Sequence, residues 1–429
     1  MSAPGPDLFP YWAWKVTPDL SAQLLFDLFS FISTPGNRLP PAMLEACLHV
    51  FSKKPPSTSI LDLRPISIPN TAVRILSSAV KTALLPFAEV LHPAQHGFIP
   101  ERDIGDPIRE VADRIYSHHR SSQPLISLFI DMRKAYDSVN RFSLITILHH
   151  FHIPDPILFA VSNLLQPTFC TTALQPPTRV PVERGVPQGS PLSPLLFVFM
   201  YDILISNLSH LSPAAFADDL YLASPTPGPL DDAYRSFTTF EAATGLALNR
   251  AKCVVLPVGN PPPFDTSSPW ATVPVENSFR YLGILIGPSL SFPALLKTPT
   301  ERIIERIGQL KALKLTFSQR LRAANTFLSP ILSYLFRFIW FPPDSLHPIA
   351  RLISEYVSPI PNALPPELIS LPTSRGGMAP PLRHLPSLNL ATLLSIPPTP
   401  PPLTQPQHPS FDLQDLLAEP PQPRPTPTP

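Results

Sequence analysis

The 429-residue sequence is poor in glycine, in charged residues and in cysteine. Its 14 glycines do not recur at a period of three among the 63 prolines, which excludes a collagen-like chain. Charged residues make up only 15%, and 32 Lys and Arg balance 31 Asp and Glu, so net charge gives no indication of a nucleic-acid partner. Three scattered cysteines form neither a disulfide framework nor a zinc site, which indicates a reducing intracellular compartment.

Long hydrophobic runs are also missing. The longest, Leu195–Leu208 and Phe327–Trp340, are interrupted by Asp202 and Arg337, and each is shorter than the roughly 20 apolar residues that a membrane-spanning helix needs. The N-terminus lacks the positive-then-apolar order of a signal peptide. We therefore expect a protein without membrane spans.

The sequence does contain ample apolar material, 44% of its residues, distributed unevenly along the chain. From about residue 37 to 287, strand-like runs alternate with helical periods, which predicts an α/β arrangement. Residues 288–396 have a more helical pattern. Residues 1–36 form an N-terminal extension, and the proline-rich tail 397–429 has the composition of a disordered segment.

Local patterns predict the individual elements. Apolar runs predict strands at Leu125–Ile130, Ala214–Phe216, Leu220–Ala223, Lys252–Leu256 and Phe279–Ile286. Helical spacing predicts helices at Asp19–Ile32, Arg141–Phe151, Asp155–Leu165, Pro191–Asn207 and Asp231–Thr244.

Two adjacent carboxylates, Asp218 and Asp219, lie between two of these short strands, in Phe-Ala-Asp-Asp-Leu-Tyr-Leu. Neighbouring carboxylates at the tip of a hairpin repel each other, so a bound cation is a reason to place them there. Hard divalent ions such as Mg²⁺ prefer carboxylate oxygen. Taken alone, however, the dipeptide is more typical of an acidic surface turn.

A third carboxylate, Asp131, follows the apolar strand Leu125–Ile130 directly. A carboxylate at the end of a buried strand is costly unless it is paired or binds a metal. If this strand neighbours the hairpin, the three carboxylates converge. Two metal ions held about 4 Å apart could then activate a 3′-hydroxyl and stabilise a leaving pyrophosphate.

A loop with two glycines, Arg184–Pro194, lies between these segments in the sequence. Its glycines allow the backbone to approach a ligand closely before a helix starts. Gln188 presents an amide to a sugar, a base or a phosphate. For the loop alone, a tight turn that enters a helix is the competing explanation.

Taken together and in this order, the segments resemble motifs A, B and C of reverse transcriptases, most closely those of non-LTR (LINE-type) retrotransposons. The three matches are Phe129–Val139, Arg184–Pro194 and Phe216–Asp219. Further matches are Leu63–Ser67 and Gln95–Phe98 with fingers motifs, Gly245–Lys252 with motif D and Phe279–Gly283 with motif E. The resemblance continues loosely to Gly376-Gly377-Met378. It implies a right-hand polymerase fold, with fingers and an α/β palm in residues 37–287 and a helical thumb-like region in residues 288–396.

The resemblance also implies roles for individual residues. Asp131, Asp218 and Asp219 would hold the metal ions, Mg²⁺ or alternatively Mn²⁺. Tyr136 corresponds to the aromatic steric gate that excludes a ribonucleotide 2′-OH. The remaining implied roles are dNTP binding by Arg64, Lys53 (or its neighbour Lys54), Gln188 and Gly189, protonation of pyrophosphate by Lys252, and support of the primer terminus by Tyr281, Leu282 and Gly283.

Plain structural roles stay open for several of these residues. Tyr136 could be a core tyrosine, Lys53 part of a solvated loop, and Lys252 an ordinary surface lysine. The fingers loop around Lys53 is short, which leaves the identity of its ligand open.

We therefore predict an RNA-directed DNA polymerase that extends a primer 3′-OH with dNTPs, with an RNA template and a DNA or RNA primer as partners. The alternative is an inactive or domesticated protein that keeps the fold and binds RNA, but the intact carboxylates, Gln188 and Tyr136 favour the enzyme. The bulk of Tyr136 also disfavours an RNA-directed RNA polymerase. Since only about 35 residues precede the fingers and three cysteines cannot build a zinc knuckle, we expect any endonuclease activity to come from another protein or domain.

Overall fold

The computed structural model describes residues 3–52, 63–172, 176–358, 370–371, 382–395 and 413. The chain divides into two compact units. The first comprises Met1–Pro107, His118–Glu276 and Leu403–Pro429, and the second comprises Ile108–Ser117 and Asn277–Pro402. The division after Glu276 lies ahead of residue 287, where the sequence pattern placed it, and the assignment of fingers, palm, thumb and tail to residue ranges stays a prediction.

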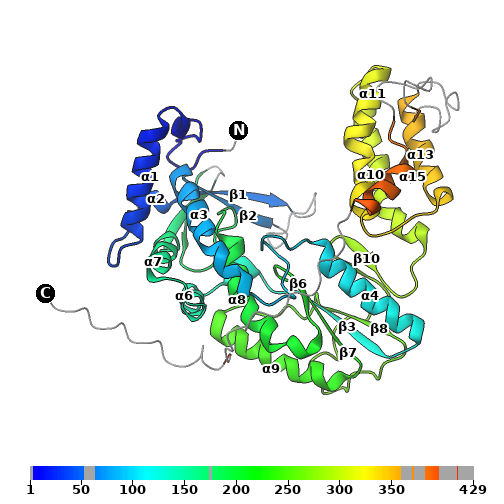
Figure 1. Ribbon diagram of the computed structural model, residues 1–429, viewed down its shortest axis with the longest axis horizontal. Helices are drawn as coiled ribbons and strands as arrows, with labels where there is room; N and C mark the ends of the chain where they lie inside the picture. Colours follow the sequence, from blue (N-terminus) through cyan, green and yellow to red (C-terminus); the bar gives the residue numbers. More distant parts are fainter. Residues whose placement is uncertain are drawn as a thin grey trace. The chain divides into compact units, whose positions relative to one another are not determined.

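The first unit contains an antiparallel sheet in the order β6-β7-β3-β8 (Figure 1). Its strands are β3 (Leu125–Ile130), β6 (Ala214–Phe216), β7 (Asp219–Ser224) and β8 (Val254–Val258). Every residue of β3 is buried, as expected of a central strand whose sequence is apolar at five of six positions. Because β3 lies between β7 and β8, its C-terminal end lies beside the start of β7.

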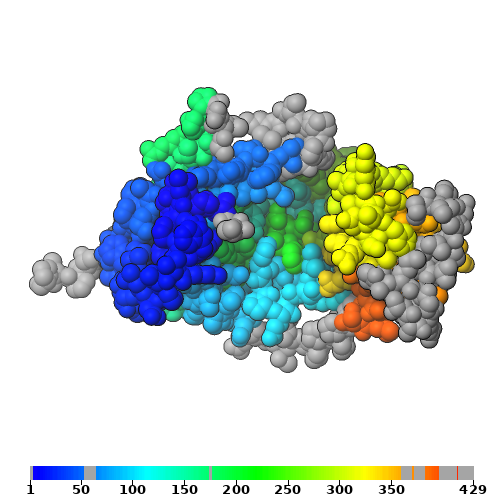
Figure 2. Space-filling view, turned by 90° about the horizontal axis from the view of Figure 1, so that it is seen from above, coloured from blue at the N-terminus to red at the C-terminus, as the bar shows by residue number. Residues whose placement is uncertain are grey.

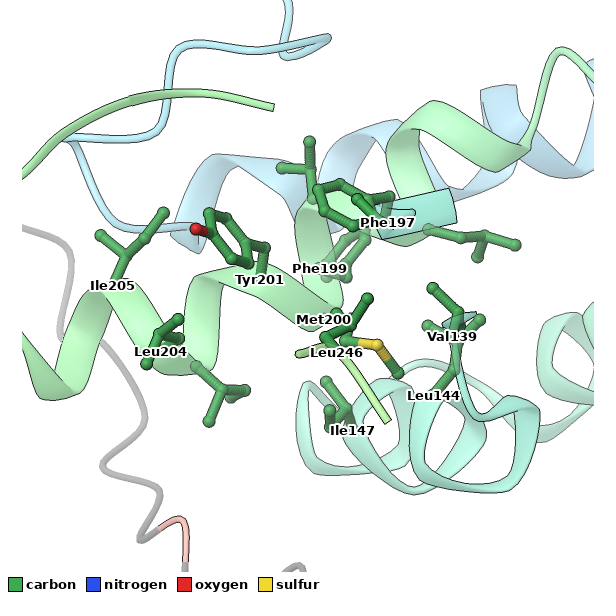
Figure 3. Close-up of a cluster of buried hydrophobic side chains, with 14 of the residues drawn as sticks. Val139, Leu144, Ile147, Phe197, Phe199, Met200, Tyr201, Leu204, Ile205 and Leu246 are labelled. Atoms are coloured by element: carbon green, nitrogen blue, oxygen red, sulfur yellow. The ribbon is translucent and has the colours of Figure 1, made fainter. Parts of the chain in front are cut away.

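The core beside this sheet is centred on helix α8 (Ser193–Asn207), whose residues are buried from Leu195 to Ile205. A helix that is apolar on all sides is stable only when it is surrounded by protein. Figure 3 shows Phe197, Phe199 and Met200 of α8 packed with Val139, Leu144, Ile147 and Leu246 from other segments. This packing joins the predicted motifs A, B and D into one core.

A second sheet of the first unit has the order β2-β1-β4-β5. Its strands are β1 (Ala46–Ser52), β2 (Leu63–Pro69), β4 (Thr168–Thr172) and β5 (Arg179–Val182). β2 is an edge strand. This position accommodates Pro65 and Pro69, because proline has no backbone N–H to donate to a neighbouring strand. Beyond this edge, the backbone N–H of Ser67 donates to the Gln188 carbonyl at 2.7 Å. The sheet is thereby attached to the predicted motif B loop.

The remaining helices up to residue 276 are α1 (Pro18–Ile32), α2 (Pro41–Leu44), α3 (Thr71–Leu84), α4 (Gly105–Ser121), α5 (Ala135–Ser138), α6 (Arg141–His150), α7 (Asp155–Leu164) and α9 (Pro227–Thr244). Short 3₁₀ segments lie at η1 (Ala13–Lys15), η3 (Leu85–Val90) and η4 (Ser209–Leu211). None of the described helices is both long enough and apolar enough to span a membrane.

The N-terminal extension leaves much of its apolar surface open to solvent. The helix predicted at Asp19–Ile32 is present as α1, and its Ile32 is fully buried. Other apolar side chains of this segment are exposed, among them Leu8, Trp12, Val16, Leu20 and Phe26. The surface view shows this segment in dark blue (Figure 2).

The second unit consists mainly of helices. Its elements are β9 (Phe279–Tyr281), β10 (Ile284–Ile286), α10 (Phe292–Lys311), α11 (Phe317–Ala323), the π-helical turn η5 (Ala324–Leu328), α12 (Pro330–Phe336), α13 (Pro343–Val357) and α15 (Leu385–Leu394). Buried Asn389 of α15 accepts the Phe341 N–H at 2.8 Å and donates to the Ile339 carbonyl at 2.8 Å, which anchors α15 to the segment that follows α12.

Most predicted elements are confirmed, with three corrections. α9 begins at Pro227 and not at Asp231, because proline is well accommodated in a first helical turn. The predicted strand Lys252–Leu256 begins only at Val254. Phe279–Ile286 is a hairpin in the second unit, because Leu282 and Gly283 both have positive φ and form its turn.

Candidate active site

The three predicted carboxylates lie at one end of the β3–β7 pair. Ile130 of β3 is paired with Leu220 of β7, so Asp131 and Asp219 are the next residues beyond that pair. Asp218 stands in the two-residue turn between β6 and β7, since Phe216 is paired with Asp219. Asp131 and Asp218, which are 87 residues apart in the sequence, therefore lie at the same end of the β3–β7 pair.

The pKa values of Asp218 and Asp219 reflect the crowding of carboxylates at this end of the strands. Burial and then the nearby Asp131 raise the pKa of Asp218, which its own backbone N–H and Arg64 partly lower again. Burial, Asp218 and Asp131 together raise the pKa of Asp219 to about 6, although water reaches part of this residue. The fold therefore holds these carboxylates together against their repulsion.

The chemistry of these residues fits a divalent cation. A positive charge beside neighbouring carboxylates offsets their mutual repulsion. Within the described ranges, however, no group of three His, Cys, Asp or Glu side chains could hold a metal ion as the side chains are placed. This is compatible with Mg²⁺, which commonly takes one or two carboxylates and completes its octahedron with water and substrate phosphates.

Asp131 is held by the segment that precedes β8. The Asn249 side-chain amide donates to Asp131 Oδ2 at 2.7 Å, and the Asn249 backbone N–H donates to the Asp131 carbonyl at 2.9 Å. The Asn249 carbonyl in turn accepts the N–H groups of Lys252 and Cys253. One carboxylate oxygen is thus oriented by Asn249, which leaves the other oxygen for a ligand.

The predicted motif B loop packs directly on the chain that follows Asp131. The N–H of Gly185 donates to the Val139 carbonyl and that of Val186 to the Tyr136 carbonyl, both at 2.8 Å. Arg141 donates to the carbonyls of Gly185, Val182 and Arg184, and burial lowers the pKa of this guanidinium to about 10. The Arg141 guanidinium thus holds the entrance of the loop in place.

The two predicted substrate residues of this loop lie between motif A and β2. The Gln188 side-chain amide donates to Asp137 Oδ1 at 3.0 Å. Gly189 is in the left-handed region, with φ of +131°, and a Cβ there would overlap the Ser67 carbonyl oxygen of β2. Only glycine satisfies both conditions, because it has no Cβ and tolerates positive φ.

Tyr136 ends a column of stacked aromatic rings. Its ring lies parallel to that of Phe197, with 5.0 Å between centroids, and Phe197 stacks on buried Tyr201 at 5.4 Å. Burial, and then the charge of Asp218, raise the pKa of Tyr136 above its usual range. Tyr136 therefore packs against the core through one face while it remains half-buried and within electrostatic reach of Asp218.

The other predicted site residues differ in placement. Arg64 is an exposed residue of β2 whose charge acts on Asp218. Lys252 is exposed in the turn before β8. Tyr281, Leu282 and Gly283 form the β9–β10 turn of the second unit, where Tyr334 donates to the Leu282 carbonyl at 2.8 Å. Lys53, Lys54 and Gly376–Met378 lie outside the described residues.

Two residues that contact the site were matched to motifs but given no role from the sequence. Asn249 orients Asp131, and Gln95 binds the turn that carries Asp218. Their neighbourhoods in the sequence, Pro-Ala-Gln-His-Gly and Ala-Leu-Asn-Arg-Ala, gave no local signal for these contacts.

Comparison with known proteins agrees with this geometry. Residues 52–286 match the family described as "Reverse transcriptase (RNA-dependent DNA polymerase)". Among curated proteins, the chain is 28% identical to the Drosophila melanogaster "Retrovirus-related Pol polyprotein from type-2 retrotransposable element R2DM", over 92% of this chain and 39% of that protein. It is 22% identical to the D. melanogaster "RNA-directed DNA polymerase from mobile element jockey", over 77% of this chain and 39% of that protein.

A solved structure, "Structure of apo telomerase from Candida Tropicalis", is 12% identical over 81% of this chain and 67% of that one, with a TM-score of 0.44. This likeness is too distant to assign a role to any residue. The chain spans about two fifths of the length of the two retrotransposon proteins.

The family match covers more than half of the chain and includes β2, β3, the motif B loop and the β6–β7 hairpin. It confirms the predicted α/β right-hand polymerase fold and, with the named relatives, the resemblance to non-LTR retrotransposon polymerases. This chain belongs to the reverse transcriptase family.

Proposed function

We propose that the protein is an RNA-directed DNA polymerase that adds dNTPs to the 3′-OH of a DNA or RNA primer on an RNA template. The observation that carries this proposal is the placement of Asp131, Asp218 and Asp219 together at one end of the β3–β7 pair. Family membership supports the same reaction. Strand cutting is not part of the proposal.

Asp131 and Asp218, with Asp219 beside them, are the residues that would hold Mg²⁺ or Mn²⁺. The bound cation would supply positive charge for the attacking 3′-oxygen and the leaving pyrophosphate. Asn249 keeps Asp131 oriented through the 2.7 Å hydrogen bond. Arg64, whose charge already acts on Asp218, is suited to the triphosphate, since guanidinium groups form paired hydrogen bonds with phosphate oxygens.

The motif B loop would form one wall of the dNTP site. Gly189 allows its backbone to approach β2, and Gln188 lies beside Asp137 of motif A. Lys252 would protonate the leaving pyrophosphate from the turn before β8, and Lys53 would contact the triphosphate. Tyr281, Leu282 and Gly283 would support the primer terminus from the β9–β10 turn.

Primer extension on poly(rA)/oligo(dT) with purified protein tests the proposal. We expect incorporation of dTTP in Mg²⁺ or Mn²⁺ and none in excess EDTA. A protein that binds this duplex but extends the primer with neither metal would contradict the proposed polymerase activity and favour an RNA-binding role.

Replacing Tyr136 with alanine should raise ribonucleotide incorporation relative to dNTPs by at least about tenfold, equivalent to about 1.4 kcal/mol of lost discrimination. The ring is fixed against Phe197, so it cannot move aside for a 2′-hydroxyl, and packed positions yield little to an overlapping group. The measurement is kcat/KM for rTTP and dTTP on the same template and primer.

Tyr136→Phe is the matched control, because it keeps the stacked ring and removes only the hydroxyl. Its preference for dNTPs should stay close to that of the wild type. If the alanine variant also keeps the wild-type preference, Tyr136 is a core residue and the sugar is selected elsewhere.

A further inference from the structure

The turn that carries Asp218 has an unfavourable backbone conformation. Ala217 and Asp218 are the two central residues of the β6–β7 hairpin, and Ala217 has φ of +56°. Asp218 is not among the positive-φ residues, so the turn has the pattern of type II′, which normally places glycine first. An alanine in this region costs about 1–2 kcal/mol, so surrounding contacts must hold it there.

Those contacts come from Gln95, which lies 122 residues earlier and is fully buried. Gln95 Oε1 accepts the backbone N–H of Ala217 at 3.0 Å. Gln95 Nε2 donates to the carbonyl of the same residue at 3.2 Å. One side-chain amide thus binds both the N–H and the carbonyl of Ala217 and fixes the orientation of the two peptide groups that flank its Cα.

Gln95 is itself rigidly placed. Its Oε1 also accepts the Gly97 N–H at 2.9 Å, and its backbone runs beside Ala215 of β6 as a short parallel bridge. Arg102 donates to the carbonyl of Gln95 at 2.6 Å and to those of His92 and Leu91. A Cβ on Gly97 would overlap the Ala217 N–H, so this segment also fits closely against the turn.

We propose that Gln95 is a positioning residue for Asp218: its amide holds Ala217 in the left-handed conformation and so aims the adjacent carboxylate at the cation site. The inference rests on the proposed polymerase function. Gln95 would affect catalysis through the backbone of Ala217, without contacting the substrate. Small misplacement of a reacting group costs one to two orders of magnitude in rate, so about a tenfold to hundredfold effect is expected.

Gln95→Met tests this directly, because methionine has a similar length but no amide. Its kcat for dTTP incorporation should fall by at least about tenfold. The KM for dTTP should change less than about threefold, because the part of the dNTP site formed by Gln188 and Gly189 is not altered. If this variant does not fold, Gln95→Glu is used, which keeps an acceptor for both N–H groups and loses the donor to the Ala217 carbonyl.

Rescue by glycine separates positioning from general stability. Adding Ala217→Gly to the Gln95 variant removes the penalty for positive φ, and should restore kcat by about threefold or more. Ser122→Gly is the matched control, because Ser122 also has positive φ, +52°, but caps α4 away from the β6–β7 turn. Rescue by Ser122→Gly to the same extent would show that Gln95 contributes stability alone, and would overturn the proposal.

Amide hydrogen exchange gives a readout that does not depend on activity. The Ala217 N–H should exchange at least about tenfold faster in Gln95→Met than in the wild type, because it loses the Gln95 acceptor, while amides of β3 should keep their protection. Unchanged exchange at Ala217 would overturn the inference. If the wild type extends no primer, the proposed function fails, whereas the exchange experiment still decides whether Gln95 holds the turn.

Discussion

Asp218→Asn should abolish primer extension, lowering kcat by at least about a thousandfold, or roughly 4 kcal/mol in the barrier. Asparagine keeps the shape of the side chain in the β6–β7 turn but removes the charge that would hold the cation. Asp131 and Asp219 remain, yet neither occupies the tip of the hairpin. Single-turnover extension of a labelled primer in Mg²⁺ measures the effect.

The same substitution should stabilise the metal-free protein at neutral pH. The pKa of Asp218 is raised in the folded state, so stability falls as the pH rises above the pKa of an unfolded aspartate, and the full cost is present above the folded-state pKa. Below the pKa of an unfolded aspartate the carboxyl is protonated in both states, and the penalty disappears. Asp218→Asn should therefore raise the Tm at pH 7.5 and have little effect on it at pH 3.5.

Asp232→Asn is the matched control for both measurements. Asp232 is an exposed residue of α9, and its replacement removes one charge away from the carboxylate cluster. It should leave extension and the Tm nearly unchanged. An Asp218→Asn variant that still extends primers at a tenth of the wild-type rate would contradict the assignment of Asp218.

The carboxylate cluster was predictable because each of its parts has a local pattern. A mostly apolar strand followed directly by Asp131, and two short strands on either side of Asp218 and Asp219, can be recognised without knowledge of the tertiary fold. In the structure β3 and β7 pair from Ile126–Ser224 to Ile130–Leu220, which brings Asp131 opposite Asp219. Their convergence therefore follows once the two strands are adjacent.

The supports of the cluster were not predictable in the same way. Gln95 and Asn249 act on residues 122 and 118 positions away, and nothing in their neighbourhood in the sequence identifies those partners. The positive φ of Ala217 and Leu282 was equally hidden, because alanine and leucine carry no preference for that region. Residues that bind backbone across a fold are recognised only when the backbone is seen.

The sheet that residues 279–286 join could not be predicted from the sequence, for a physical reason. Residues 279–286 have the apolar alternation of a strand, which does not reveal the sheet that the strand joins. Among the residues that the structure describes, they pair with each other as β9 and β10, and Tyr334 of α12 holds their turn. The second unit thus has its own β-hairpin.

Gly189 allows the motif B loop to approach β2 closely, and its replacement should have the second large effect. Gly189→Ala places a Cβ on the Ser67 carbonyl and forces alanine into a φ of +131°. Either β2 or the loop must move, and each carries residues proposed to bind the dNTP, Arg64 on β2 and Gln188 in the loop. We expect kcat/KM for dTTP to fall by about a hundredfold or more, since displacements near 1 Å have effects of that size.

Gly228→Ala controls for the general effect of adding a methyl group, because a Cβ there meets nothing within 4 Å and Gly228 lies in α9, where alanine is favoured. That variant should keep full activity and be equally or more stable. Gly189→Ala should remain folded, with a loss of about 1–3 kcal/mol, because positive φ and one backbone overlap are local costs. The loss in kcat/KM should therefore persist well below the Tm of the variant. If Gly189→Ala is as active as Gly228→Ala, the close approach of the motif B loop to β2 is not needed for activity. The proposal that these two segments bind the nucleotide would then be wrong.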